Sequence, residues 1–306
     1  MHRKGRKEKG GGGAAAASSI AEGGEGEGEG STIMASGKVI MQIAVMVMMV
    51  VVCVFAPRVS ADSKLLKAID AEDLDAIRDI LNSGEEHIDH PHKSKSGTKT
   101  AVFIAAEDDK IKALRMMLKE FKPDITKGDD RGFTALDTAG YFGLTEAVDS
   151  ILEIAGPENN YFRDMKGADG NSWITRLVWG DEPKHAETLK LVLDKYEYDP
   201  NTTGAEGVTL LHSAAHYGSL LTMKALLAAG ADVTKVDSEG NTALHYVART
   251  GDLPQYIKIT SALIKGGCDK FHRNRQGLSA FDIAELGSNQ RKEVIHPKVK
   301  ALLKTK

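Results

Sequence analysis

A helix-start signal that returns six times constrains the fold of this chain more than any other feature. A serine or threonine marks each start, at Thr100, Thr134, Ser172, Thr209, Thr242 and Ser279, and successive marks are 33 to 38 residues apart. Such hydroxyls accept hydrogen bonds from the free backbone N–H groups at a helix N-terminus. In five of the six cases a glycine lies two residues earlier, where a tight turn needs a positive φ. The signal therefore predicts a row of similar helical units.

Apolar triplets with the spacing 0, 3, 4 form a second, independent signal, because that spacing places three side chains in one stripe of a helix. They occur at Ile77-Ile80-Leu81, Leu114-Met117-Leu118, Val148-Ile151-Leu152, Leu189-Val192-Leu193, Met223-Leu226-Leu227 and Val299-Leu302-Leu303, and in unit six Thr260 precedes Leu263-Ile264. The two signals predict seven helix-turn-helix units, at about residues 62–96, 97–131, 132–169, 170–206, 207–239, 240–276 and 277–306. The first unit lacks the start signal, which is typical of an end cap.

The clearest unit resembles a known repeat family. It opens with Thr209-Leu210-Leu211-His212, continues with Ala214-Ala215 and stops at Gly218. This resembles the ankyrin repeat, whose fingerprint is T-P-L-H-x-A in a period of about 33 residues, with Leu210 in place of the proline. The resemblance implies an all-α ankyrin-repeat solenoid of about seven helix-turn-helix units joined by β-hairpin-like loops. It also implies a module that binds other proteins through a concave surface, without a cofactor.

Unit four departs most from this pattern. Ser172-Trp173-Ile174-Thr175 replaces the fingerprint, and Leu177-Val178 replaces the alanine pair. Larger residues at these places should push the neighbouring helix away or require small partners. Extra residues also precede the second helices of units four, six and seven, near 181–183, 253–256 and 287–292. Insertions in repeat proteins collect on one face, often the binding face.

The composition is that of a globular protein, with 42% hydrophobic residues. The formal net charge of -3 argues against a nucleic-acid binder that relies on attraction to phosphates. Only one of the two cysteines, Cys268, lies in the repeats, so no intramolecular disulfide framework is expected there. Cys268 occupies the place of Ala231 in unit five and is predicted to be a small buried residue, with a reactive or intermolecular thiol as the alternative. We expect a monomer.

Residues 1–33 have low complexity, with a basic cluster, glycine and alanine runs and a Glu-Gly alternation. Such a segment has little to bury and is predicted to be disordered. The basic cluster could alternatively serve as a nuclear signal. A second methionine, Met34, begins a more conventional protein, so both Met1 and Met34 remain open as the start.

Residues 34–61 have the order of a secretory signal peptide. The apolar run over 39–56 is followed by small residues that fit cleavage after Ala61. Its 18 residues exceed the ~7–15 of a signal and fall at the short end of the roughly 17–25 of a spanning helix. We expect cleavage and a secreted or lumenal protein, with a retained single-pass anchor as the alternative. An anchor would leave the repeats in the cytosol, because within about 15–20 residues of the run Arg58, Lys64 and Lys67 follow it and Lys38 alone precedes it.

The resemblance implies where a protein partner would bind, since first helices and hairpin tips line the concave surface of ankyrin domains. The positions just before the helix-stopping glycines hold Tyr141, Phe142, Trp179, His216, Tyr217 and Arg249. Aromatic and arginine side chains are the usual anchors of an interface, although these could instead pack on the neighbouring repeat. The hairpin tips Asp129, Asp130, Arg131, Glu239, Arg273 and Arg275 would set charge complementarity.

Histidines raise the question of catalysis or metal binding. His212 and His245 share the fourth fingerprint slot with Asp137 and Asp282, which indicates a polar group near a helix start rather than a proton shuttle. The sequence has no nucleophile elbow, phosphate-cradling glycine loop or paired Cys ligands. The loop His87–His92 could bind zinc or copper in an alternative, metal-dependent function, but its proline and loop setting favour no metal site.

Asn201-Thr202-Thr203 is the only glycosylation acceptor in the chain, and it would carry a glycan only in a lumenal or secreted protein. Asn201 could equally be a turn residue. The sequence thus predicts a non-catalytic scaffold or adaptor routed to the secretory or endomembrane system. A membrane-tethered cytosolic adaptor is the alternative, and the partner cannot be read from the sequence.

Overall fold

The structure is a computed structural model that describes residues 63–94, 97–156, 170–250, 252–290 and 295–304. The chain divides into two units, residues 1–56 and 57–306, and all the described residues belong to the second. The predicted disordered segment, the apolar run and the cleavage position after Ala61 therefore lie outside the described residues. Within those ranges, no helix is both long and apolar enough to cross a membrane.

Fourteen α-helices in the described ranges form seven consecutive pairs. The pairs are α2 (Lys64–Asp70) with α3 (Leu74–Ser83), α4 (Ala101–Glu107) with α5 (Ile111–Met116), α6 (Ala135–Phe142) with α7 (Thr145–Ala155), α9 (Trp173–Leu177) with α10 (Pro183–Lys195), α11 (Leu210–Tyr217) with α12 (Leu220–Ala228), α13 (Ala243–Thr250) with α14 (Gln255–Lys265), and α15 (Ala280–Gln290) with α16 (Pro297–Leu303). The π-helix η1 (Met117–Phe121) continues α5, and the 3-10 helix η2 (Ala205–Gly207) precedes α11. The strands β1 (His92–Ser94) and β2 (Gly97–Lys99) form an antiparallel hairpin before α4.

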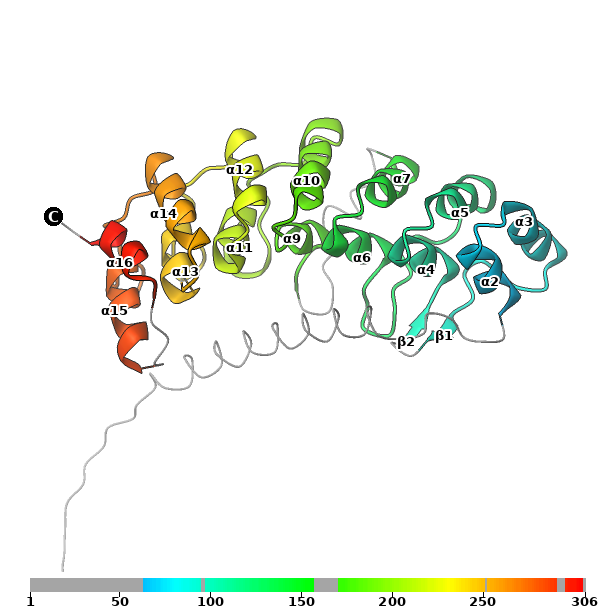
Figure 1. The fold of residues 1–306 in the computed structure, drawn as a ribbon, viewed down its shortest axis with the longest axis horizontal. Coiled ribbons are helices and arrows are strands. Elements are labelled where there is room, and N and C mark those ends of the chain that lie inside the picture. The colour runs from blue at the N-terminus through cyan, green and yellow to red at the C-terminus, as the bar shows by residue number, and fades with distance from the viewer. Residues whose placement is uncertain (1–62, 95–96, 157–169, 251, 291–294, 305–306) are drawn as a thin grey trace, which may run out of the picture. The chain divides into compact units, whose positions relative to one another are not determined.

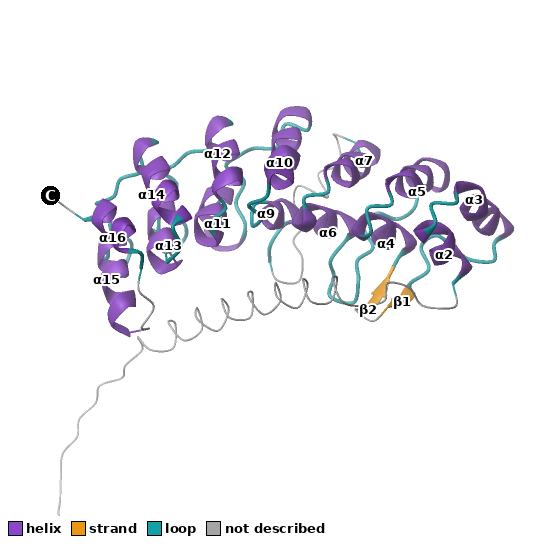
Figure 2. Ribbon diagram, viewed as in Figure 1, coloured by secondary structure: helices purple, strands orange, loops and turns teal. Residues whose placement is uncertain are grey.

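The helices form two layers (Figures 1 and 2). First helices contact one another in the order α2, α4, α6, α9, α11, α13 and α15, and second helices in the order α3, α5, α7, α10, α12, α14 and α16. We call these the first-helix layer and the second-helix layer. The core lies between them, where Ile77, Leu114, Ile151, Val192 and Leu226 of the predicted triplets are fully buried. The predicted seven-unit, all-helical stack is confirmed.

The predicted helix-start signal is also confirmed. The hydroxyls of Thr100, Thr134, Ser172, Thr209 and Ser279 accept a bond from the backbone N–H three residues later, at 3.2 to 3.4 Å. The glycines two residues before the marks have φ values of 72° to 77°. Glycine is needed at Gly240 for a second reason, since an added Cβ would lie 3.2 Å from the backbone nitrogen of Arg275 in the next hairpin.

The fourth-slot side chains close the helix starts, as predicted. The backbone N–H of Thr134 donates to Asp137 at 2.9 Å, that of Thr209 to His212 Nδ1 at 3.1 Å, and those of Thr242 and Ser279 to His245 and Asp282 at 3.2 and 2.9 Å. Each pair satisfies backbone groups that a helix end leaves free. These histidines and aspartates are therefore structural groups.

Unit four is accommodated by a small partner, one of the two predicted outcomes. The buried Trp173 of α9 lies against Gly140 of α6, where an added Cβ would be 3.1 Å from the Trp173 carbonyl oxygen and 3.2 Å from its ring. Because a side chain at Gly140 has no space, the glycine allows the bulky helix to approach.

The insertions of units four, six and seven differ in structure. In unit four Asp181 and Glu182 lie in the loop between α9 and α10, and Pro183 begins α10. In unit six Gln255 and Tyr256 already begin α14, directly after Pro254. In unit seven residues 287–290 lengthen α15 instead of forming a loop. Unit five ends α11 at Gly218 in the left-handed conformation (φ 74°), and the corresponding place in unit seven holds Ser288. The helix-stopping residue is therefore missing there.

Candidate protein-binding site

Aromatic side chains from three adjacent first helices meet at the C-terminal ends of those helices. Trp179 follows α9, His216 and Tyr217 end α11, and Tyr246 and Arg249 lie on α13. The Trp179 and Tyr217 rings are 4.8 Å apart, the Tyr217 and His216 rings 4.9 Å, and the His216 and Tyr246 rings 6.0 Å. The Arg249 guanidinium lies 5.7 Å from the Tyr246 ring centre. We call these five side chains, all half-buried, the aromatic ladder.

Tyr246 is anchored between His216 and Arg249 in the ladder. Its hydroxyl donates to Asp237 Oδ2 at 2.8 Å, and the same carboxylate accepts from the side chain and backbone of Asn241. Burial, together with the neighbouring Asp237 carboxylate, raises the pKa of Tyr246. Burial alone would raise the pKa of Asp237, but its hydrogen bonds with Asn241 and Tyr246 lower it overall. The tyrosine therefore stays a neutral donor and the aspartate a charged acceptor.

His216 is held by its backbone and not by its ring. Its carbonyl oxygen accepts from the hydroxyls of Tyr256 at 2.7 Å and Thr250 at 3.0 Å. Burial, with a smaller contribution from Arg249, lowers the pKa of His216 to about 4, so the ring is neutral near pH 7. Within the part of the chain that the structure describes, His216 Nδ1 and Trp179 Nε1 are buried without a hydrogen-bond partner. Buried polar atoms are rarely left unpaired in a native protein.

Tyr141 and Phe142 lie away from the ladder. Their rings contact each other edge to face at 5.1 Å, and Tyr141 is 9% exposed. No ring contact between described residues joins this pair to the ladder. The Tyr141 carbonyl oxygen accepts from His185 Nε2 at 3.0 Å, so this part of α6 is tied to unit four.

The predicted hairpin-tip charges are mostly engaged within the domain. Asp129 is 6% exposed and binds the Arg131 guanidinium at 2.7 Å, and Asp130 accepts from the backbone N–H of Thr98 in the preceding hairpin. Arg273 binds Asp282 at 3.1 Å, and Glu239 lies 3.6 Å from Arg249. Arg275 is exposed, and its backbone N–H donates to the Glu239 carbonyl at 2.9 Å. Three of these contacts lie within one hairpin or join it to the first helix that follows, and those of Asp130 and Arg275 connect neighbouring hairpins.

Comparisons with known proteins agree with this architecture. A family model described as ankyrin repeats, three copies, matches residues 181–281. The crystal structure of the ankyrin repeat domain of Bcl-3 aligns with a TM-score of 0.62 and 18% identity, covering 80% of this chain and 99% of that one. The human ASB11 ankyrin repeat domain aligns with a TM-score of 0.61, 20% identity and the same coverage. The fold is that of an ankyrin-repeat domain.

Curated relatives are similar to this chain over only part of their own length. Palmitoyltransferase AKR1 of Candida albicans is 38% identical over 77 residues, and AKR1 of Debaryomyces hansenii 39% over 77, which is 25% of this chain and 9% of each relative. AKR1 of Lachancea kluyveri is 23% identical over 228 residues, 72% of this chain and 29% of the relative. The chain thus spans less than a third of these proteins.

Tyr246 was not among the residues predicted from the sequence. It occupies the fifth position of the fingerprint, whereas the predicted residues lie just before the glycine that ends each first helix. A usable signal was present, because Tyr246 and Arg249 are three residues apart and such pairs lie on one helix face.

The ankyrin domain uses the His87–His92 loop as a connector. His87 Nδ1 accepts from the Asp89 backbone N–H at 3.2 Å, and Asp89 accepts from the backbone of Asp124 in the next unit at 2.9 Å. His92 lies in β1, 7% exposed, with Nδ1 3.8 Å from Glu86. In the described ranges no three His, Cys, Asp or Glu side chains are grouped as metal ligands.

Two other predicted residues have structural contacts. The Asn201 side-chain oxygen accepts from the Asp232 backbone N–H at 2.8 Å, which connects units four and five. Cys268 is 4% exposed, and burial raises the pKa of its thiol. A buried, protonated thiol is a packing group, as the sequence predicted.

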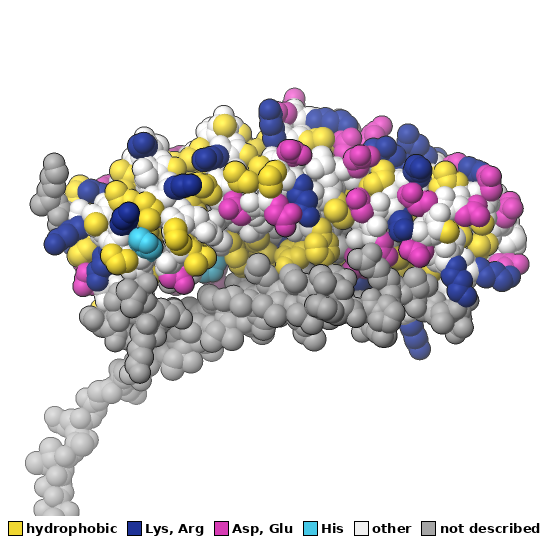
Figure 3. All heavy atoms as spheres, in the orientation of Figure 1, with side chains coloured by type: hydrophobic (Ala, Val, Ile, Leu, Met, Phe, Trp, Pro, Cys, Tyr) yellow, Lys and Arg dark blue, Asp and Glu magenta, His cyan; other side chains and the backbone are white. Residues whose placement is uncertain are grey.

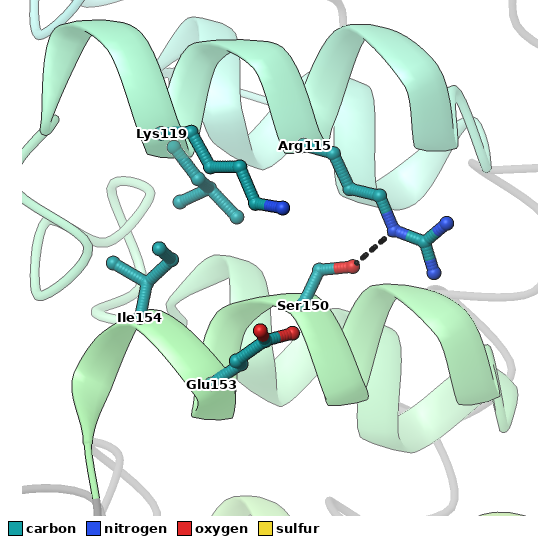
Figure 4. Close-up of a pocket in the computed structure, with 6 residues that line it drawn as sticks. Arg115, Lys119, Ser150, Glu153 and Ile154 are labelled. Carbon is teal, nitrogen blue, oxygen red and sulfur yellow. Dashed lines mark hydrogen bonds between the residues drawn. The ribbon is translucent and has the colours of Figure 1, made fainter.

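A shallow pocket lies between the second helices of units two and three (Figure 4). Arg115 and Lys119 face Ser150, Glu153 and Ile154 across it. Arg115 Nε donates to the Ser150 hydroxyl at 3.1 Å. Because basic and acidic groups face each other, the pocket has no preference for an anion or a cation.

Proposed function

We propose that the ankyrin domain is a scaffold or adaptor that holds a protein partner on the aromatic ladder. The observation that carries the proposal is the row of half-buried rings from Trp179 through Tyr217 and His216 to Tyr246, with the Arg249 guanidinium beside it. Trp, Tyr and Arg are also the residue types that dominate binding energy at interfaces.

The charges near the ladder favour a specific contact over a general electrostatic attraction. Arg249 lies 3.6 Å from Glu239, with both side chains partly exposed, so the pair holds the guanidinium only weakly. A partner carboxylate could therefore exchange with Glu239. Elsewhere, basic and acidic side chains are interspersed on the face in Figure 3. Binding on that face therefore does not depend on a large patch of one charge sign.

Site-specific photocrosslinking in cells tests this proposal. A photoreactive amino acid would replace Tyr217 in one protein and the exposed Lys224 of α12 in another. We expect a single partner protein to crosslink to the variant labelled at position 217 and not to the variant labelled at position 224. We also expect His216→Ala to reduce the yield of the crosslink at position 217. Equal crosslinking at the two positions would contradict a site on the ladder.

For the compartment, we propose entry into the secretory pathway with cleavage after Ala61. The apolar run over residues 39–56 and the small residues that follow it support this. The alternative is a retained anchor with the repeats in the cytosol. Mass spectrometry of the mature N-terminus distinguishes them, since cleavage gives a first residue of Asp62 and retention gives Met1 or Met34.

A further inference from the structure

The His185 ring fills the space between two glycines from different units. It lies in the first turn of α10 and is 5% exposed. A Cβ added to Gly180 would lie 2.2 Å from the ring, and one added to Gly143 would lie 3.0 Å from it. The ring is therefore packed directly on the backbone of the α9–α10 loop and of the α6–α7 turn. His185 therefore supports the loop that carries Trp179.

One nitrogen of this ring is bonded and the other is not. Nε2 donates to the Tyr141 carbonyl oxygen at 3.0 Å, which assigns the hydrogen to Nε2, because a carbonyl can only accept. Nδ1 is buried without a hydrogen-bond partner among the described residues. A second proton on the ring would gain only a small contribution from the Glu182 backbone, which is outweighed by the cost of burying the charge.

The groups around the ring give a proton little compensation. The charged side chains that act on it are Glu182 and Lys184, which precede or begin its own helix and act in opposite directions. The other elements contribute the Tyr141 carbonyl from α6 and uncharged backbone at both glycines, while Asp181 accepts from the Leu221 backbone N–H at 2.7 Å. Burial lowers the pKa of His185 below its ordinary 6.5.

We propose that His185 is an acid-sensitive latch that releases Trp179 from the aromatic ladder when its ring takes a second proton. The inference rests on the proposed function of the ladder, whose regulation it describes. The protonated ring turns from the apolar space toward water, and its contact with Gly180 is lost. The Trp179 carbonyl oxygen, which accepts from the Ser219 hydroxyl at 2.7 Å, belongs to the same loop. Acidification then moves the indole away from Tyr217 and weakens partner binding.

Indole NMR signals of the full chain test the latch without a partner. The chain has two tryptophans, so buried Trp173 is an internal control for Trp179. In a titration from about pH 7.5 to about pH 5, we expect the Trp179 signal to shift with a midpoint below 6.5 while Trp173 changes little. His185→Gln keeps a donor for the Tyr141 carbonyl and cannot titrate, so it should abolish the shift. His92→Gln, a change at a buried histidine of unit two, should preserve it.

Two results would overturn the latch. One is an unchanged Trp179 shift in His185→Gln. The other is a Trp179 midpoint that differs from that of the His185 ring signal in the same wild-type spectra, a comparison that needs no variant to fold. Since neither uses a partner, a failed titration leaves the proposed function in place. Conversely, if crosslinking shows that the ladder binds no partner, the result of the titration still stands.

Discussion

Removal of the Arg176 charge should destabilise the middle of the domain. Arg176 Nη1 lies 2.6 Å from Asp137 Oδ1, and the two side chains are only 1% and 2% exposed. The guanidinium also lies 4.5 Å from the Phe133 ring centre, and Nη1 donates to the Asn171 carbonyl at 3.0 Å. Arg176 thus connects unit four to the helix start of unit three, 39 residues away.

The size of the effect follows from burial. The attraction between unit charges near contact is about 4 kcal/mol at an effective dielectric constant near 20. Arg176→Met keeps much of the volume and leaves the Asp137 carboxylate with the Thr134 backbone and hydroxyl donors, both at 2.9 Å. Because breaking a buried ion pair costs roughly 3–5 kcal/mol, we expect a loss in that range.

Urea unfolding of the full chain, followed by circular dichroism, measures this loss. The double variant Arg176→Met with Asp137→Asn is the control, since it removes the uncompensated charge as well. It should be less destabilised than the sum of the two single variants, by at least about 1 kcal/mol. An Arg176→Met protein within about 1 kcal/mol of wild type would refute the view that this pair holds units three and four together.

Three further predictions concern the stack, pH and compartment. Leu226 is fully buried between neighbouring units, so Leu226→Ala should lower the free energy of unfolding by about 2–5 kcal/mol in urea melts. Leu303→Ala in the last unit should lower it clearly less, because a terminal repeat has one neighbour. Equal losses would contradict this. Burial lowers the pKa of His245 to about 4, despite its bond to the Leu278 carbonyl, so its stabilisation is complete above 6.5 and is lost as pH falls toward 4. His245→Gln should reduce the difference between urea midpoints at about pH 7 and about pH 5, and an unchanged difference would refute that role. If the protein enters the secretory pathway, glycosidase should shift its gel mobility and Asn201→Gln should remove the shift, whereas a glycan-free, membrane-bound protein would support the cytosolic anchor.

The sequence predicted the features that local interactions determine. Thr209, His212 and Gly218 act within one turn of their own helix, so their spacing alone indicates a helix start and stop. Burial of triplet residues such as Leu226 likewise follows from helical periodicity. The repetition of the units then predicted the order in which they stack, because each unit buries its apolar face against the next unit along the chain.

The contacts between units could not be predicted in the same way. Arg176 binds Asp137 and His185 binds the Tyr141 carbonyl, and each pair is about 40 residues apart in the chain. Unit four departs from the repeat pattern at these positions, so neighbouring units offered no template for them. Likewise, the candidate Tyr141 is a buried residue of α6, whereas Tyr246 belongs to the ladder, since side-chain direction depends on how adjacent helices are rotated.

The affinity of the crosslinked partner tests the central claim most directly. The dissociation constant would be measured for wild type, for a ladder variant with His216, Tyr217 and Arg249 changed to alanine, and for a control with the exposed Lys224 and Lys258 changed to alanine. We expect wild-type affinity for the control and a loss of at least about 30-fold for the folded ladder variant, equivalent to about 2 kcal/mol. A ladder variant that melts like wild type and binds with the same affinity would contradict it.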